Sequence, residues 1–306
     1  MGYIQGVELI TGTQPKPALL KRVIATLGEL PVSQVGVVST VMRMTADINT
    51  EIHKLSQVLS ADQGLTARVL RMSNSPFYGR MRGVGSLNEA IMILGFYTIR
   101  SLVVATSTHA MFKRDSNGEL EKDLWRHSLA VGLGARIVSR RINSSCAEES
   151  FLAGLMHDIA ILILLQRFPQ EYMPVITEIR AGRESLPDVE KEILGVSHTE
   201  LGAIILEQWN LPRFLVEVTR HHHHPESVPA DAGKDGSGKE IVRTAHVVCF
   251  ADGLAKSLGY GFHQPPQINL TEHPSAKFLG LTPEAIGQVS EELSARFAEE
   301  LKLFEE

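Results

Sequence analysis

The stretch Phe151-Leu-Ala-Gly-Leu-Met-His157-Asp158-Ile-Ala-Ile-Leu-Ile163 places a histidine and an acid inside an apolar run that we assign to a helix. A carboxylate in such surroundings costs on the order of several kcal/mol unless it is paired or bound to a metal. Two interpretations are therefore open. Asp158 forms a buried salt bridge with an arginine such as Arg126 or Arg136, or it belongs with His157 to a metal site.

The rest of the chain shows apolar residues at the same helical spacing, as in Leu19, Val23 and Leu27. No convincing pair of strands is visible in the pattern. The sequence therefore predicts an all-α protein. The predicted helices cover residues 17–29, 33–46, 51–59, 62–73, 86–112, 120–142, 147–168, 170–181, 187–208, 212–222, 239–258 and 282–304.

A break at Asp115-Ser-Asn-Gly118 divides these helices into two groups. We expect an N-terminal helical bundle over 1–115, packed on a C-terminal helical bundle over 116–306. The first part has 12 Lys and Arg against 7 Asp and Glu, a net charge of +5, and the second has 18 against 28, a net charge of −10. These signs favour docking of the two parts, or an anionic partner for the first and cations for the second.

The composition, 43% hydrophobic and 21% charged over 306 residues, is that of a globular chain and excludes a disordered one. The longest apolar run, Ile159 to Leu165, is much shorter than the roughly 20 residues that cross a bilayer. The start MGYIQGVELI lacks the basic region of a signal peptide. Cys146 and Cys249 form no CxxC motif, which argues against a disulfide framework. We expect a cytoplasmic protein that does not engage a membrane.

Histidines and acids recur at intervals of about one helical hairpin, which a helical bundle needs to bring them to one end. Imidazole and carboxylate groups that converge from several helices are the ligands of a metal pair. We expect His223 and His224 to lie exposed in a loop, and His246 to be structural. The candidate ligands are Asp123, His127, His157, Asp158, His198, His221, His222 and Asp252.

The chain resembles the HDOD branch of the HD superfamily over roughly residues 20–260. The HD motifs are Trp125-Arg-His127-Ser, Ala147-Glu-Glu-Ser-Phe-Leu-Ala-Gly-Leu-Met-His157-Asp158-Ile and Val248-Cys-Phe-Ala-Asp252. The HDOD motifs are Leu30-Pro31, Leu59-Ser-Ala-Asp62-Gln-Gly-Leu-Thr-Ala-Arg68-Val-Leu-Arg-Met-Ser-Asn74-Ser75, Ala90-Ile-Met-Ile-Leu-Gly95, His198-Thr-Glu-Leu-Gly202 and Trp209-Asn-Leu-Pro212.

This resemblance implies a helical fold and a metal-dependent phosphohydrolase ancestry. In the HD superfamily the metal ligands follow the order His, His-Asp, Asp, which His127, His157-Asp158 and Asp252 match. The related HD-GYP enzymes, which hydrolyse cyclic di-GMP, add an acid four residues before the first His and further histidines downstream. Asp123, His198, His221 and His222 match those positions.

The chain departs from the phosphohydrolase pattern in two places. Such enzymes usually follow His-Asp with Ile-Gly-Lys, whose lysine stabilises a phosphate. Here the sequence is Ile159-Ala160-Ile161, so the lysine is missing from that position. The histidines at 221–224 also lead to no Gly-Tyr-Pro motif.

Three functional hypotheses follow. The first is a signal-transduction module of bacterial type that binds metal, acts through a regulatory protein partner and does not catalyse. The second is a metal-dependent phosphohydrolase acting on a nucleotide or cyclic dinucleotide. Both use one or two metal ions, and histidines with carboxylates favour iron, with manganese or zinc as alternatives. The third is nucleic-acid binding through Phe77, Tyr78, Arg80 and Arg82, which the sequence disfavours.

Overall fold

The structure is a computed structural model that describes residues 17–27, 32–74, 83–114, 118–229, 231–232, 237–261 and 268–305. Within these ranges the regular elements are all helices, which confirms the predicted all-α class. The first five are α1 (Pro17–Leu27), α2 (Val32–Ala46), α3 (Ile52–Ser60), α4 (Gln63–Ser73) and α5 (Leu87–Arg114). The others are α6 (Glu119–Arg141), α7 (Ala147–Met156), α8 (Ile159–Arg167), α9 (Pro169–Arg180), α10 (Leu186–Leu194), α11 (His198–Gln208), α12 (Arg213–His221), the short η2 (Pro225–Ser227), α13 (Gly238–Ser257), α14 (Pro274–Leu279) and α15 (Pro283–Glu305).

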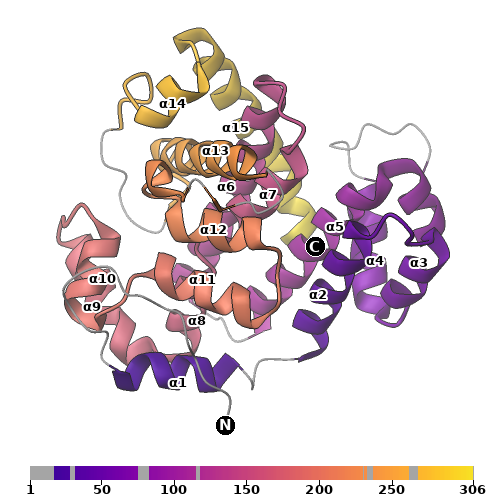
Figure 1. Cartoon of the computed structure of the whole chain (residues 1–306), viewed down its shortest axis with the longest axis horizontal. Coiled ribbons are helices and arrows are strands. Elements are labelled where there is room, and N and C mark those ends of the chain that lie inside the picture. Colours follow the sequence, from indigo (N-terminus) through magenta and orange to yellow (C-terminus); the bar gives the residue numbers. More distant parts are fainter. Residues whose placement is uncertain are drawn as a thin grey trace.

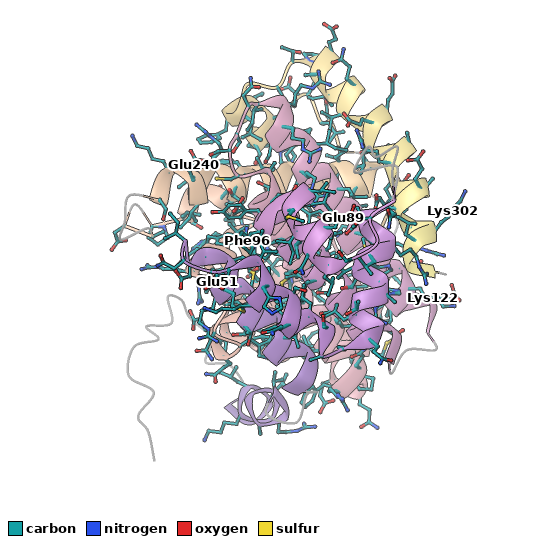
Figure 2. All side chains as sticks on the ribbon, turned by 90° about the vertical axis from the view of Figure 1, so that its right-hand side faces the viewer. Glu51, Glu89, Phe96, Lys122, Glu240 and Lys302 are labelled. Atoms are coloured by element: carbon teal, nitrogen blue, oxygen red, sulfur yellow. The ribbon has the colours of Figure 1, made fainter. Side chains whose placement is uncertain are left out.

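Helices α2 to α5 pack together at one side of the molecule (Figure 1). Their contact is apolar, with Leu55, Leu59 and Val69 fully buried. Asp62 fixes the start of α4 because its carboxylate accepts a hydrogen bond from the backbone of Leu65. Viewed from this side, α5 lies in front of the C-terminal helices (Figure 2). Helices α2 to α5 therefore pack against the rest of the chain through α5, and one hydrophobic cluster includes residues from both parts.

Helix α5 is long and apolar enough over Leu87–Ala110 to cross a membrane by composition alone. Its most apolar window is 61% buried inside the structure, as in the core helix of a soluble domain. The helix is also interrupted at Gly95, whose φ of 78° lies in the left-handed region that favours glycine. These features assign α5 to the protein core.

Helix α1 lies apart from α2 to α5, beside the helices α8 to α11 (Figure 1). Its Arg22 pairs with Glu171 of α9 at 2.6 Å and lies over the ring of Phe168. The N-terminal residues are thus shared between two packing units. The predicted domain boundary at residue 115 lies outside the described residues, and the division into 1–115 and 116–306 stays a prediction. Phe77, Tyr78, Arg80 and Arg82 also lie outside the described residues.

Helix α6 is the central element of the C-terminal bundle, since it contacts α7, α13 and α15. Its approach to α7 is close because Gly132 and Gly154 face each other without side chains. A Cβ atom on Gly154 would lie 2.9 Å from the carbonyl oxygen of Val131. The two helices can therefore approach so closely only with glycine at this crossing.

Two predicted helices are each split in the structure. The prediction of one continuous helix over 147–168 is wrong, because α7 ends before His157–Asp158 and a turn precedes α8. The prediction of one continuous helix over 187–208 is also wrong, because α10 ends at Gly195, whose φ of 79° is left-handed. Ser197 then caps α11 and forms a capping box with Glu200. Both breaks occur beside candidate ligands, and they turn those side chains towards the bundle interior.

Candidate metal centre

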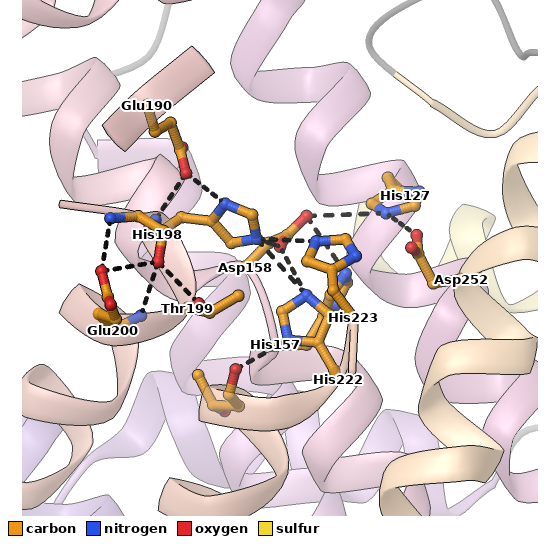
Figure 3. Close-up of polar contacts among 12 residues, drawn as sticks. His127, His157, Asp158, Glu190, His198, Thr199, Glu200, His222, His223 and Asp252 are labelled. Atoms are coloured by element: carbon orange, nitrogen blue, oxygen red, sulfur yellow. Dashed lines mark hydrogen bonds and ion pairs between the residues drawn. The ribbon is translucent and has the colours of Figure 1, made fainter. Parts of the chain in front are cut away.

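The seven side chains of a buried His and Asp cluster come from five places in the C-terminal bundle (Figure 3). His127 lies in the middle of α6, and Asp252 lies in α13. The other members come from turns or helix ends. They are His157 and Asp158 between α7 and α8, His198 at the start of α11, and His222 and His223 after α12.

Asp158 is the centre of this cluster because each of its oxygens faces a different pair of histidines. Its Oδ2 lies 3.2 Å from His157 Nε2 and 3.7 Å from His127 Nε2. Its Oδ1 lies 3.4 Å from His198 Nε2 and 3.7 Å from His222 Nε2. A single carboxylate thus connects two groups of imidazoles.

We call these two groups the first and the second subsite. In the first, ligand atoms of His127, His157 and Asp158 lie within 4.8 Å of one another. Asp252 extends it, since its Oδ1 lies 3.1 Å from His127 Nε2. The second subsite gathers the ligand atoms of three histidines within the same distance. They are His198, His222 and His223.

Three of the imidazoles are oriented by backbone carbonyl groups. The Nδ1 atoms of His127, His157 and His222 lie 2.6, 2.7 and 2.8 Å from the carbonyl oxygens of Tyr260, Gly154 and Thr219. A carbonyl only accepts, so each Nδ1 carries the proton and donates. In the neutral form of each ring, the Nε2 lone pair points into the cluster. This is the tautomer that a metal-binding histidine requires.

A buried carboxylate orients His198 in a different way. His198 Nδ1 donates to Glu190 Oε2 at 2.6 Å, and the backbone N–H of His198 donates to the same oxygen. The hydroxyl of Tyr172 donates to the other oxygen, Oε1, at 2.7 Å. Glu190 and Tyr172 are fully buried. A carboxylate behind a histidine raises its basicity as a metal ligand, so the second subsite has a supporting pair that sequence reasoning missed.

The polar atoms inside the cluster are poorly satisfied by the protein alone. His157 Nε2, Asp158 Oδ1 and Asp252 Oδ1 are buried and make no hydrogen bond. An unsatisfied buried polar group costs about 1–3 kcal/mol, and more when it is charged. Metal ions between the imidazoles and carboxylates would satisfy these atoms. The residues present therefore fit a metal centre.

The electrostatics of the cluster keep the acids ionised. Burial acts to raise the pKa of Asp158, but the neighbouring His157, followed by His198, holds that pKa well below its usual range. Burial, together with the nearby His157, lowers the pKa of His222 to about 3. The carboxylate of Asp158 is thus charged and the ring of His222 is neutral, as metal binding requires.

A lysine that sequence reasoning missed also lies at this centre. Lys256, one turn after Asp252 on α13, places its Nζ 2.6 Å from Asp252 Oδ2. Lys256 therefore places a positive charge at the cluster, although the lysine of the usual phosphohydrolase motif is missing after His157-Asp158. The i, i+4 spacing to Asp252 was the signal in the sequence.

Two of the eight predicted ligands lie outside the cluster. The carboxylate of Asp123 is 40% exposed and lies 3.6 Å from the guanidinium of Arg126. His221 hydrogen-bonds Ser227 at 2.7 Å and faces Glu217. Their assignment as ligands stays a prediction that this geometry does not support.

His223 occupies a place that the sequence did not assign to it. The expectation of an exposed loop residue is wrong for His223, whose Nε2 lies 3.1 Å from His198 Nε2, and correct for the exposed His224. The chain turns directly after α12, so the residues at 222 and 223, rather than 221 and 222, point inward. The expected structural role of His246 agrees with its stacking on Phe278.

Comparison with known proteins shows which solved structures share this fold. A crystal structure of an HDOD domain protein of unknown function from Geobacter sulfurreducens superposes with a TM-score of 0.73 at 24% identity, covering 94% of this chain and 96% of that one. A protein from Shewanella amazonensis SB2B, whose name suggests a phosphohydrolase, gives 0.70 at 21% identity over 92% and 97% of the two chains. At such identities the likeness concerns the fold.

The sequence profile of the HDOD domain matches residues 31–225, more than half of the chain. The chain belongs to the HDOD domain family. It is also 23% identical over 229 residues to an uncharacterized protein of Treponema pallidum (strain Nichols), covering 74% of this chain. That match spans only 43% of the relative, which is therefore a much longer protein.

Proposed function

We propose that this chain is a regulatory HDOD module that binds two metal ions and acts through a protein partner without catalysing a reaction. The observation that carries the metal-binding part is the position of Asp158 between two groups of histidines. Each group offers enough ligand atoms for one ion. Asp158 would contribute one carboxylate oxygen to each subsite, and Asp252 would complete the first subsite.

Histidine and carboxylate ligands favour iron, with manganese or zinc as alternatives. The proposed metal ligands do not include the thiol of Cys249, which lies three residues before Asp252. Burial raises the pKa of the Cys249 thiol to about 11, which disfavours the thiolate form. When bound, such ions act as Lewis acids and as fixed positive charges. The residues described above would hold these ions and orient the ligating side chains.

A regulatory role needs a route from the centre to a surface that a partner can bind. Helix α7, which leads to His157, contacts α5 of the N-terminal bundle. Arg100 of α5 pairs with Glu149 of α7 at 2.7 Å, and Arg100 is buried. The proposal is that loading of the metal centre shifts α7 and is relayed to α2–α5 through this pair. We place this activity in the cytoplasm.

A metal-dependent phosphohydrolase that acts on a nucleotide or cyclic dinucleotide is the second candidate function. Lys256 favours it, because a partly buried ammonium beside a metal pair is suited to bind a phosphate oxygen. The replacement of the usual Gly-Lys after His-Asp-Ile by Ala160-Ile161 favours the regulatory role instead.

Hydrolysis assays separate the two candidates. Metal-loaded wild type is compared with the double variant His157→Ala/Asp158→Ala on a cyclic dinucleotide and a nitrophenyl phosphodiester. The regulatory proposal predicts equal, background rates for both proteins. Turnover by the wild type clearly above that of the double variant would reject the non-catalytic role and leave the phosphohydrolase.

A further inference from the structure

The side chain of Lys256 brings a positive charge to the metal centre. Its ammonium hydrogen-bonds Asp252 Oδ2, which leaves Oδ1 to face His127 in the first subsite. Lys256 also lies close enough to Asp158, His198 and His223 to affect their electrostatics. The lysine thus acts electrostatically on members of both subsites from one helix.

A count of formal charges shows the consequence. Asp158, Asp252 and the buried Glu190 contribute three negative charges, while Lys256 contributes one positive charge and neutral imidazoles none. The protein therefore supplies a net charge of about −2 to this region. Two divalent ions would leave an excess of about +2, in a buried region where excess charge is expensive.

This excess selects the kind of ligand that can enter. Among the described residues, His223 of the cluster and the neighbouring Lys256 are partly exposed, so they mark the side open to solvent. An oxyanion that arrives there would meet the ammonium of Lys256 and the metal ions together. A doubly charged phosphate group would neutralise the excess.

We propose that Lys256 makes the filling of both subsites depend on a bound oxyanion of the phosphate class. One ion binds the protein alone, and the second binds tightly only when the oxyanion is present. By thermodynamic linkage, metal loading strengthens oxyanion binding by the same factor. This inference rests on the metal centre proposed above and adds the signal that the centre would report.

The test is a calorimetric titration of the metal-free full chain with Mn²⁺. It is run without anion, with inorganic phosphate and with a nucleoside monophosphate, which separates free phosphate from a nucleotide as the source. In the wild type, one of these anions should tighten binding of the second ion about tenfold, within the usual range of coupling between sites. Lys277→Met, which removes an exposed lysine of α14, should behave like the wild type.

Variants of Lys256 show whether this lysine is responsible. In Lys256→Met the second ion should bind more tightly without anion, and the effect of the anion should fall below about threefold. Lys256→Arg retains the charge and should retain the coupling. Circular dichroism of both variants checks the fold.

Each contrary result has a distinct meaning. A wild type that binds two ions equally well with and without both anions overturns the proposal, whatever the variants do. Lys256→Met with the full anion effect overturns it as well. Failure of the wild type to bind any Mn²⁺ under all three conditions would instead reject the metal centre itself, and the coupling with it.

Discussion

Asp158 is the residue on which both subsites depend, because its two oxygens face different histidines. The second subsite depends equally on His223, which the turn after α12 directs inward while His221 points outward. Two histidines that lie two positions apart thus have different environments. This difference makes a matched pair of substitutions available in a single run of histidines.

In the presence of the phosphate-class oxyanion, His223→Ala is expected to lower the metal content by one equivalent, because it removes a ligand of the second subsite only. His221→Ala should keep the wild-type content, since that ring binds Ser227 and Glu217. Elemental analysis of both variants checks this prediction. Loss of metal in His221→Ala with retention in His223→Ala would contradict the assignment.

Glu190→Gln is expected to weaken metal binding at the second subsite about 10- to 100-fold, the usual effect of losing a carboxylate behind a ligating histidine. The amide retains the size of the side chain but not its charge, so His198 becomes a less basic and weaker metal ligand. Titration with Mn²⁺ measures the affinity. The control is Glu200→Gln, which alters the partly exposed capping box of α11, the helix that begins with His198. Equal affinities in the two variants would argue against the role of Glu190.

At the level of helices, the site is built where helices end. His157, Asp158, His198, His222 and His223 all lie at or beside a helix terminus, whereas the sequence predicted two continuous helices through the first three. The apolar periodicity of 147–168 continues through the break, so it could not reveal the turn. Gly195 and the capping box Ser197-His-Thr-Glu200 were readable signals for the second break.

Gly154→Ala tests the close crossing of α6 and α7. The added methyl group would meet the backbone of residues 131 and 132 at 2.9–3.0 Å, so the helices must separate. We expect a loss of about 1–3 kcal/mol in the free energy of unfolding, together with weaker metal binding at the first subsite. Chemical denaturation measures the first effect.

The matched control for this substitution is Gly287→Ala in α15. Gly287 is exposed and has open space around its Cβ position. Its replacement should leave stability unchanged or raise it by up to about 1 kcal/mol. Similar destabilisation by both substitutions would show that the α6–α7 crossing is not the cause.

At the level of the whole molecule, the metal centre lies in the C-terminal bundle and the Arg100–Glu149 pair connects that bundle to α5. The sequence predicted the all-α class and six of the clustered residues, because ligand chemistry and helical spacing are local. It could not place α1 against α9 and α11, assign His223 or find Lys256 and Glu190. Those depend on where helices end and how they pack, which spacing alone does not determine.

Metal removal should affect the molecule beyond the site. Addition of a chelator is expected to speed hydrogen exchange in α6 and α13, and to a smaller extent in α5, because α5 is coupled to α7. Glu149→Gln should lose the response of α5 and keep that of α6. Hydrogen-exchange mass spectrometry resolves these helices. A response in α5 that persists in Glu149→Gln would exclude this pair as the connection.

The central claim, a two-ion centre whose subsites share Asp158, is tested most directly by elemental analysis of protein made without a histidine tag and purified under low oxygen. With inorganic phosphate or a nucleoside monophosphate present throughout, the wild type should contain about two equivalents of metal, because the second ion binds tightly only when the oxyanion is bound. His157→Ala/Asp158→Ala should contain almost none, with helicity unchanged by circular dichroism. A wild type without bound metal when metal is supplied, or a double variant with the same content, would contradict the claim.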